Sequence, residues 1–252
     1  MGAIVGQTIV GIDVGGSSIK YAPVEPGTGR LLQPLASVPT PEHGKLEPLI
    51  SCLAELAGKS AFGASVGVAL PSVIRNGVAL TAANLDESLI GADVRGLLQA
   101  KVGQPVVFLN DADAAGIAEM RLGAAKGVSG TVMVLTFGTG IGSALFVDGR
   151  LVPNTELGHL ELNGREAEHQ ASARVRSEES LDWAQWSERV NQYLACIDGL
   201  FWPDLIVIGG GVSERFDEFG SLLRSRARIR CAKLGAAAGV VGAALAASGL
   251  QP

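Results

Sequence analysis

Glycine turns, carboxylates at strand ends and a glutamate–histidine pair are the residues of this sequence whose spacing could do chemistry. Residues 135–161 contain two of these features, because a glycine-rich turn at 138–142 separates two apolar strands and Glu156 and His159 follow. Glycines between strands leave backbone N–H groups that can converge on a phosphate. Glutamate and histidine can hydrogen-bond the hydroxyls of a polyol. The stretch therefore predicts both halves of a phosphoryl-transfer site, although any hairpin can contain a glycine turn.

The same strand–turn–strand pattern occurs about half a chain earlier, at residues 7–24. For either turn alone an ordinary hairpin is the better interpretation, but the pair at the start of both halves favours phosphate binding. The residues predicted to line the phosphates are Gly15, Gly16, Ser17, Ser18 and Lys20 on one side and Gly138, Thr139 and Gly140 on the other.

Asp13 ends the first predicted strand, just before the first turn. Mg²⁺ prefers a few carboxylates together with phosphate oxygens, so Asp13 is the predicted metal ligand, holding magnesium through water. The alternative is a strand-end aspartate that only forms the turn.

Asp111 is the predicted general base. A buried strand at 105–109 leads directly into Asn110 and Asp111, and a helix follows to about Leu122. The carboxyl ends of strands are the usual ligand sites of α/β sheets. A carboxylate there can accept the proton of an attacking hydroxyl. The alternative is that Asp111 merely caps the helix, a role for which Asp113 competes.

The elements that must position these groups form two similar halves. The first combines strands at 7–14, 19–24 and 64–70, a further strand ending near Pro39, and helices at 46–59 and 94–102. The second has the strands of 132–147, helical patterns at 166–176 and 182–200, and a buried strand at 205–208 followed by glycines and a helix. The pattern predicts a duplicated α/β fold of two lobes with an interlobe cleft. We expect one lobe at 1–109, completed by the helix 234–249, and the other at 110–233.

Composition narrows the class of protein. The 252 residues are 47% hydrophobic and 18% charged, as in a globular protein, and the net charge of −5 argues against a nucleic-acid partner. Cys52, Cys196 and Cys231 are widely separated and odd in number, which predicts reduced thiols in a cytoplasmic protein. We find no export signal, and the apolar run at 234–247 is too short to span a bilayer, so no membrane partner is expected.

Several segments together resemble the actin-like (ribonuclease H-like) sugar kinases, and among them the repressor, open reading frame, kinase (ROK) family. The segments at 11–20 and 136–140 resemble the two phosphate loops, and Asn110–Asp111–Ala112 resembles the catalytic segment. The segments at 67–71, 81–86, 153–161 and 181–186 resemble the ROK members that phosphorylate glucose from inorganic polyphosphate. A further loop resembles the one that closes over a nucleotide, and its glycines are Gly209, Gly210 and Gly211.

The resemblance implies a phosphotransferase that moves a phosphate of polyphosphate to the 6-hydroxyl of glucose, with mannose as a further acceptor, ATP as a second donor and Mg²⁺ as cofactor. It also implies a homodimer. Residues 163–168 contain no cysteine where most of the wider family has a zinc-binding cluster, so no structural zinc is expected. Leu89 departs from the expected tryptophan. The implied sugar ligands are Asn84, Asn110, Asp111, Glu156, His159 and Glu168; His43 and His169 receive no role.

Three alternatives remain open. A strictly ATP-dependent ROK glucokinase or mannokinase would use the same residues. A sugar-responsive repressor would need a DNA-binding extension before the first loop, where only a few residues precede the strand. A non-catalytic sugar-binding regulator would lack turnover, although Asp111 and both phosphate loops are present.

An arginine row at 224–230, followed by Lys233, is unexpected in an acidic protein. If this segment is extended, alternate arginines lie on one face about 6–7 Å apart. Such a row could pair with a long polyanion at several points. A solvated edge strand kept soluble by its charge is the favoured alternative.

Overall fold

The computed structural model describes residues 8–59 and 63–249 and divides the chain into two compact units. The first unit runs to Ala118 and includes the segment from Ala237 onward, and the second is Glu119–Ala236. Helix α3 (Asp111–Arg121) therefore begins in the first unit and ends in the second, whereas the sequence-based boundary lies before this helix. Gln7, where the first predicted strand begins, lies outside the described residues.

The first unit is built on one mixed sheet with strand order β3-β2-β1-β5-β8, to which β4 adds beside β2. β1 pairs antiparallel with β2 and parallel with β5, which pairs parallel with β8. Besides α3, the elements of this unit are β1 (Thr8–Val14), β2 (Ser18–Glu25), β3 (Arg30–Leu31), β4 (Ala36–Pro39), η1 (Pro41–Gly44), α1 (Leu46–Lys59), β5 (Gly63–Leu70), β6 (Ile74–Arg75), β7 (Val78–Ala79), η2 (Glu87–Leu89), α2 (Val94–Val102), β8 (Val106–Asn110) and α8 (Ala238–Ala247).

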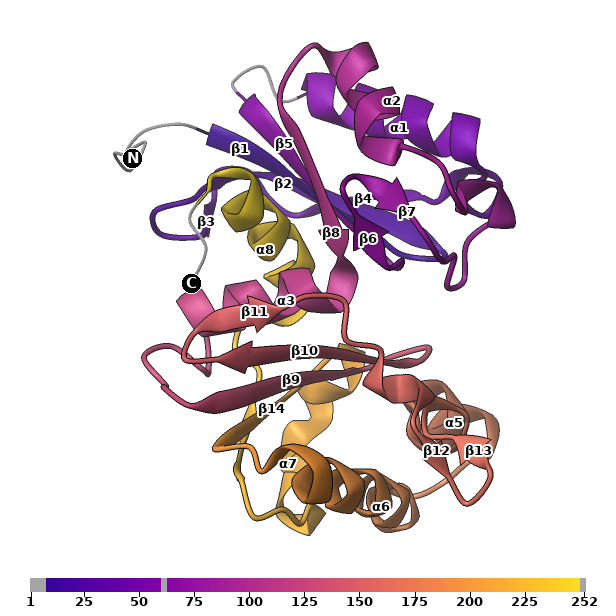
Figure 1. The fold of residues 1–252 in the computed structure, drawn as a ribbon, viewed down its shortest axis with the longest axis vertical. Coiled ribbons are helices and arrows are strands. Elements are labelled where there is room, and N and C mark those ends of the chain that lie inside the picture. Colours follow the sequence, from indigo (N-terminus) through magenta and orange to yellow (C-terminus); the bar gives the residue numbers. More distant parts are fainter. Residues whose placement is uncertain (1–7, 60–62, 250–252) are drawn as a thin grey trace. The chain divides into compact units, whose positions relative to one another are not determined.

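Alternation along β1 divides the side chains between the two faces of this sheet. Val10 and Ile12 join the core under α1 and α2, and Ile9 joins the cluster under α8 on the other face (Figure 1). α8 approaches the sheet closely because glycines lie under it. A Cβ at Gly67 would lie only 1.9 Å from the carbonyl oxygen of Ala243, and one at Gly11 only 2.0 Å from that of Val240. Glycine is therefore required at both positions.

The second unit repeats this arrangement with strand order β11-β10-β9-β14-β15. β9 pairs antiparallel with β10 and parallel with β14, which pairs parallel with β15, so both sheets join one hairpin to two parallel strands. The predicted duplication of an α/β unit is thereby confirmed. Its elements are β9 (Thr131–Phe137), β10 (Ile141–Val147), β11 (Arg150–Val152), η3 (Leu157–His159), β12 (Glu161–Leu162), β13 (Arg165–Glu166), α4 (Glu168–Ala171), α5 (Ala173–Glu178), α6 (Trp183–Phe201), β14 (Leu205–Gly209), η4 (Gly211–Arg215), α7 (Phe216–Phe219), η5 (Gly220–Leu222), β15 (Arg228–Cys231) and η6 (Gly235–Ala237), which ends at the first residue of the other unit.

Long helix α6 closes the core of the second unit. Asp182 caps it by accepting the Gln185 N–H, and the Gln185 side chain returns a hydrogen bond to the Asp182 N–H. Its buried Trp186 ring meets Phe137 of β9 edge-on, with ring centroids 5.6 Å apart. Aromatic packing of this kind fixes the helix against the sheet from which the second glycine turn emerges.

One expectation for the second unit is wrong. The single helical pattern at 166–176 is instead strand β13 and two short helices, α4 and α5, because Ser172 ends α4 and its side chain caps α5. Only part of the arginine row is extended, because β15 begins at Arg228, and β15 lies at the edge of its sheet. Arg226 instead stacks on Trp202, with its guanidinium carbon 4.1 Å from the ring centroid.

Across the described residues 8–59 and 63–249, no helix combines the length and the apolar character that crossing a membrane requires.

Candidate active site

Asp111 begins α3 at the carboxyl end of β8, as predicted. The helix cap is its neighbour Asn110, whose buried side-chain oxygen accepts the N–H groups of Ala112 at 2.9 Å and Asp113 at 3.1 Å. The Asn110 amide donates to the carbonyl of Ser72 at 3.3 Å. The Asp111 carboxylate also accepts the Ala112 N–H, at 2.8 Å, so Asn110 and Asp111 share the start of this helix.

Asp13 and Asp111 are coupled carboxylates of the first unit. Burial and the negative charge of Asp111 raise the pKa of Asp13 to about 6, although the nearby Lys20 opposes the shift. Burial also raises the pKa of Asp111, against hydrogen bonds from the backbone. Two neighbouring carboxylates that resist ionisation are suited to accept a proton or to hold a cation. Asp13 faces the first turn of α8, where a Cβ at Gly239 would lie 2.6 Å from its carboxyl carbon.

The first predicted phosphate loop is held by hydrogen bonds within the first unit. The Gly15 N–H donates to the carbonyl of Ser18 at 2.9 Å, and the Thr40 hydroxyl donates to the carbonyl of Gly15 at 2.6 Å. Gly16 lies so close to Asn84 that a Cβ would be 2.9 Å from the Asn84 carbonyl oxygen. The structure thus brings a predicted sugar ligand against the phosphate loop. Of this set, Ser17 is exposed, whereas Ser18 and Lys20 are partly buried.

The second predicted phosphate loop is closed by Glu168. Within the turn, the Gly138 N–H donates to the carbonyl of Gly140 at 3.0 Å, and Thr139 is exposed. The Glu168 carboxylate accepts the Ile141 N–H at 3.3 Å, and a Cβ at Gly140 would lie 2.4 Å from its Oε2. Glu168, predicted only as a sugar ligand, therefore also shapes this loop.

The third glycine loop packs against the second. Gly210 has a φ of +79°, and a Cβ there would lie 2.4 Å from the carbonyl oxygen of Phe137, the last residue of β9. The Ser213 hydroxyl donates to the Gly210 carbonyl at 2.7 Å. Only glycine fits this position. Gly209 ends β14 and Gly211 begins η4, so the loop joins a buried strand to a short helix.

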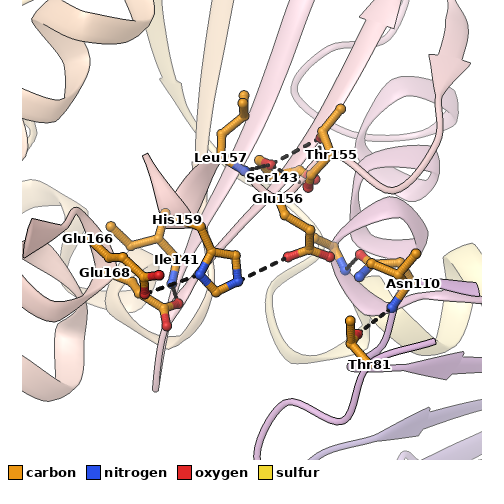
Figure 2. Close-up of polar contacts among 12 residues, drawn as sticks. Thr81, Asn110, Ile141, Ser143, Thr155, Glu156, Leu157, His159, Glu166 and Glu168 are labelled. Carbon is orange, nitrogen blue, oxygen red and sulfur yellow. Dashed lines mark hydrogen bonds and ion pairs between the residues drawn. The ribbon is translucent and has the colours of Figure 1, made fainter. Parts of the chain in front are cut away.

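Glu156 and His159 lie on a segment that is pinned to β10. The Ser143 hydroxyl donates to the carbonyl of Thr155 at 2.7 Å and accepts the N–H of Leu157 at 3.1 Å. The His159 Nε2 lies 4.0 Å from the Glu156 carboxylate, and its Nδ1 lies 3.2 Å from the Glu166 carboxylate (Figure 2). These two nitrogens therefore face different carboxylates.

The charges around His159 set its protonation. Partial burial lowers its pKa, but the hydrogen bond that the imidazole donates to Glu166 and the negative charges of Glu168, Glu166 and Glu156 outweigh burial and raise the pKa. The imidazole is thereby shifted toward the cationic form, in which both nitrogens donate hydrogen bonds.

Comparison with known proteins identifies the family. The model of the ROK family matches residues 9–174. The chain belongs to the ROK family. It is 44% identical over 237 residues to the polyphosphate glucokinase of Mycobacterium tuberculosis, covering 94% of this chain and 89% of that protein.

Solved structures agree with this assignment. The inorganic polyphosphate/ATP-glucomannokinase of Arthrobacter sp. strain KM is similar at 45% identity with a TM-score of 0.91, over 96% of this chain and 98% of that one. The ROK family glucokinase of Streptomyces griseus in complex with glucose and AMPPNP is 24% identical with a TM-score of 0.80, over 95% and 99% of the two chains, which shows the shared fold. The duplicated sheets are thus those of the actin-like sugar kinases.

Two residues of this ROK chain join the site although sequence reasoning assigned them nothing: Glu166 and His169. The ligand atoms of His159, Glu166 and Glu168 lie within 4.8 Å of one another, which is close enough to hold a metal ion. His169 lies beside the same carboxylates. The sequence signal was the two glutamates of the segment at 163–168, which lacks cysteines, and the histidine directly after it. Leu89, the other departure, is fully buried in the core of the first unit, so its role there is packing.

Proposed function

We propose that this ROK protein is a polyphosphate-dependent glucokinase that phosphorylates the 6-hydroxyl of glucose. The observation that carries the proposal is the 44% identity to a polyphosphate glucokinase over 94% of the chain. The 45% identity to a polyphosphate/ATP-glucomannokinase supports ATP as a second donor and mannose as a second acceptor.

Asp111 is the proposed general base. The sugar oxygen attacks the terminal phosphorus, the bond from that phosphorus to the bridging oxygen breaks, and the hydroxyl proton passes to Asp111. The raised pKa of Asp111 makes it a stronger proton acceptor than an ordinary carboxylate. Asn110 accepts the N–H groups of Ala112 and Asp113, so the start of the helix does not depend on Asp111 alone, although Asp111 also accepts the Ala112 N–H.

The remaining site residues bind and orient. We propose that Asn84, Asn110, Glu156, His159 and Glu168 bind sugar hydroxyls, and that the loops at 15–20, 138–140 and 209–211 bind phosphate groups. Mg²⁺, when bound, neutralises charge on the transferred phosphate, and Asp13 would hold it through water. The partly buried Asp13–Asp111 pair fits a divalent cation, because the cation would relieve their mutual repulsion.

We also propose a cytoplasmic homodimer without nucleic-acid or membrane partners. The three cysteines, which form no disulfide, support the compartment, and the net charge of −5 argues against a nucleic-acid partner. The homodimer is what the family resemblance implies. Light scattering of the purified protein tests the dimer, and a monomer at micromolar concentration would contradict it.

A matrix of donors and sugars tests the proposed function. Polyphosphate and ATP are each paired with glucose and mannose, and formation of the corresponding sugar 6-phosphate is measured. Polyphosphate with glucose is expected to give the highest kcat/KM. Activity with ATP alone would instead favour a strictly ATP-dependent kinase, which the Gly209–Gly211 loop also suits. Glucose binding without turnover under any donor would favour a non-catalytic regulator.

A further inference from the structure

Glu166 lies between two imidazoles of the second unit. One of its oxygens, Oε2, lies 3.2 Å from Nδ1 of His159 and 3.5 Å from Nδ1 of His169. Figure 2 shows Glu166 and Glu168 on one side of the His159 ring and Glu156 on the other. A single carboxylate oxygen thus serves as the partner of two rings.

The backbone holds Glu166 in this position. Glu166 ends strand β13, which is joined to β12 by a two-residue turn at 163–164, where both residues have positive φ. The Gln170 side-chain amide donates to the carbonyls of Leu162 and Arg165, both at 2.8 Å, and so clamps this hairpin to helix α4. The carboxylate is therefore presented by a fixed hairpin and not by a loose loop.

We propose that Glu166 is a positioning residue for His159, which rests on the proposed function of His159 as a sugar ligand. An ionised carboxylate only accepts hydrogen bonds, so Nδ1 of His159 carries a proton whether the ring is neutral or cationic. Nε2 is then the ring atom left to face Glu156 and a sugar hydroxyl. Fixing one nitrogen of a histidine in this way determines both its tautomer and its ring orientation.

The same carboxylate extends its effect to the second glycine loop. Nε2 of His169 lies 3.8 Å from Glu168 Oε1, and Glu168 Oε2 accepts the Ile141 N–H that ends the loop. The two imidazoles thus separate carboxylates that would otherwise repel one another. Because these side chains are partly exposed, each imidazole–carboxylate contact adds little to the stability of the fold. The contacts act mainly by orienting the rings and the carboxylates.

A bound metal ion is the competing explanation for this cluster, because His159, Glu166 and Glu168 could share one. The carboxylate–imidazole contacts account for the geometry without an ion, since each nitrogen named already faces a carboxylate. Metal analysis of the purified enzyme decides between the two explanations. A stoichiometric ion that is lost on Glu166→Gln would overturn the positioning role.

Kinetics of Glu166→Ala and Glu166→Gln test the inference, with the donor that the wild type uses. Glu166→Ala is expected to raise the KM for glucose about tenfold and to leave the KM for the phosphate donor within about twofold of the wild-type value. The KM of Glu166→Gln for glucose should lie between those of the wild type and Glu166→Ala. Glu161→Gln is the matched control, because Glu161 faces Glu166 across the same hairpin and is exposed. A wild-type KM for glucose in folded Glu166→Ala would contradict the role.

Imidazole nitrogen resonances provide a readout that does not depend on turnover. In the wild type, His159 is expected to carry its neutral-state proton on Nδ1 and to titrate above the usual range of histidine. Glu166→Gln, which keeps the side-chain shape, should mix the tautomers and lower that pKa. If the wild type fails to phosphorylate glucose, the proposed function falls while this measurement still decides the positioning role. An unchanged tautomer and titration in Glu166→Gln would overturn it.

Discussion

The two units of this protein hold their carboxylates in different ways. In the first, Asp13 and Asp111 are partly buried near each other, and both have raised pKa values. In the second, Glu156, Glu166 and Glu168 are partly exposed and surround imidazoles. In the second unit it is the pKa of His159 that is raised, by the hydrogen bond to Glu166 and by the negative charges of these glutamates.

The difference indicates different tasks. A buried carboxylate that resists ionisation gains most from receiving a proton or a cation, which suits the reacting hydroxyl and the phosphates. A carboxylate paired with imidazole remains ionised and accepts hydrogen bonds, which suits recognition of neutral hydroxyls. Substitutions can therefore separate chemistry from sugar binding.

The largest expected effect is that of Asp111→Asn on turnover. Loss of the general base should lower kcat by about 10³-fold and change the KM for glucose little. Glu156→Gln should do the reverse, raising the KM about tenfold with kcat within a few fold. Asp93→Asn is the control, because Asp93 caps α2 and asparagine is an equivalent cap. Full activity in Asp111→Asn would overturn the mechanism.

Displacing helix α8, whose first turn packs against Asp13, should lower the stability of the protein. Gly67→Ala places a Cβ against the Ala243 carbonyl and pushes α8 from the sheet, so we expect a loss of about 2–4 kcal/mol in the free energy of unfolding. Gly58→Ala is the control, because Gly58 lies in α1 with open space around it and alanine there should stabilise by up to about 1 kcal/mol. Urea denaturation measures both. Equal stability of Gly67→Ala and the wild type would contradict the close packing.

Asp13→Asn tests the electrostatic cost of the buried pair. Because the folded pKa of about 6 lies above the ordinary value of 3.8, the aspartate stabilises the fold fully below pH 3.8, and this contribution is lost as pH rises to about 6. Without magnesium, the variant should therefore be more stable than the wild type above pH 6, by on the order of 1–3 kcal/mol. Thermal melts at pH 4 and pH 8 check this. A gain of the same size at both pH values would show that another cause operates.

The smallest expected effect concerns the arginine row of the second unit, whose members differ in their contacts. Arg230 donates to the carbonyl of Ala124 at 2.7 Å, and Arg226 stacks on Trp202, whereas Arg228 is an exposed residue of edge strand β15. At low salt, we expect the Arg226→Ala/Arg228→Ala variant to raise the KM for long polyphosphate two- to threefold and to leave the KM for ATP unchanged. The measurement is made at low salt because salt screens contacts between exposed charges. Arg75→Ala in β6 is the control. Unchanged polyphosphate kinetics at low salt would end this hypothesis.

The sequence predicted most of the elements because local patterns determine them. Helices α1 and α2 begin and end at the predicted residues, since apolar periodicity and, in α2, Asp93 and Gly103 mark the ends. The division of residues 166–176 was missed because it depends on a tertiary contact. The Trp186 indole of α6 donates to the carbonyls of Ala171 and Ser172, where α4 ends.

The candidate site was predictable where a single segment carries it and not where segments meet. Asp13, Asp111 and the glycine loops were found because each lies at or just after the end of a strand. The capping role of Asn110 is visible only once the first turn of α3 is placed. The contacts of Glu166 with two histidines are visible only once its hairpin is placed beside them. The charge of a residue is visible in the sequence, but the neighbours that raise or lower its pKa are not.

Helix α8 gives the first unit an unusual order of assembly. Its residues contact β1, β5 and β8, which are made long before it, and the whole of Glu119–Ala236 comes between. At about 5–20 residues per second, a ribosome needs roughly 6–25 s after Ala118 to deliver this helix. Until then the glycine-lined face of the first sheet has no partner. The nascent protein should therefore bind chaperones through its earliest part, and a ribosome stalled before residue 238 should leave that part sensitive to protease.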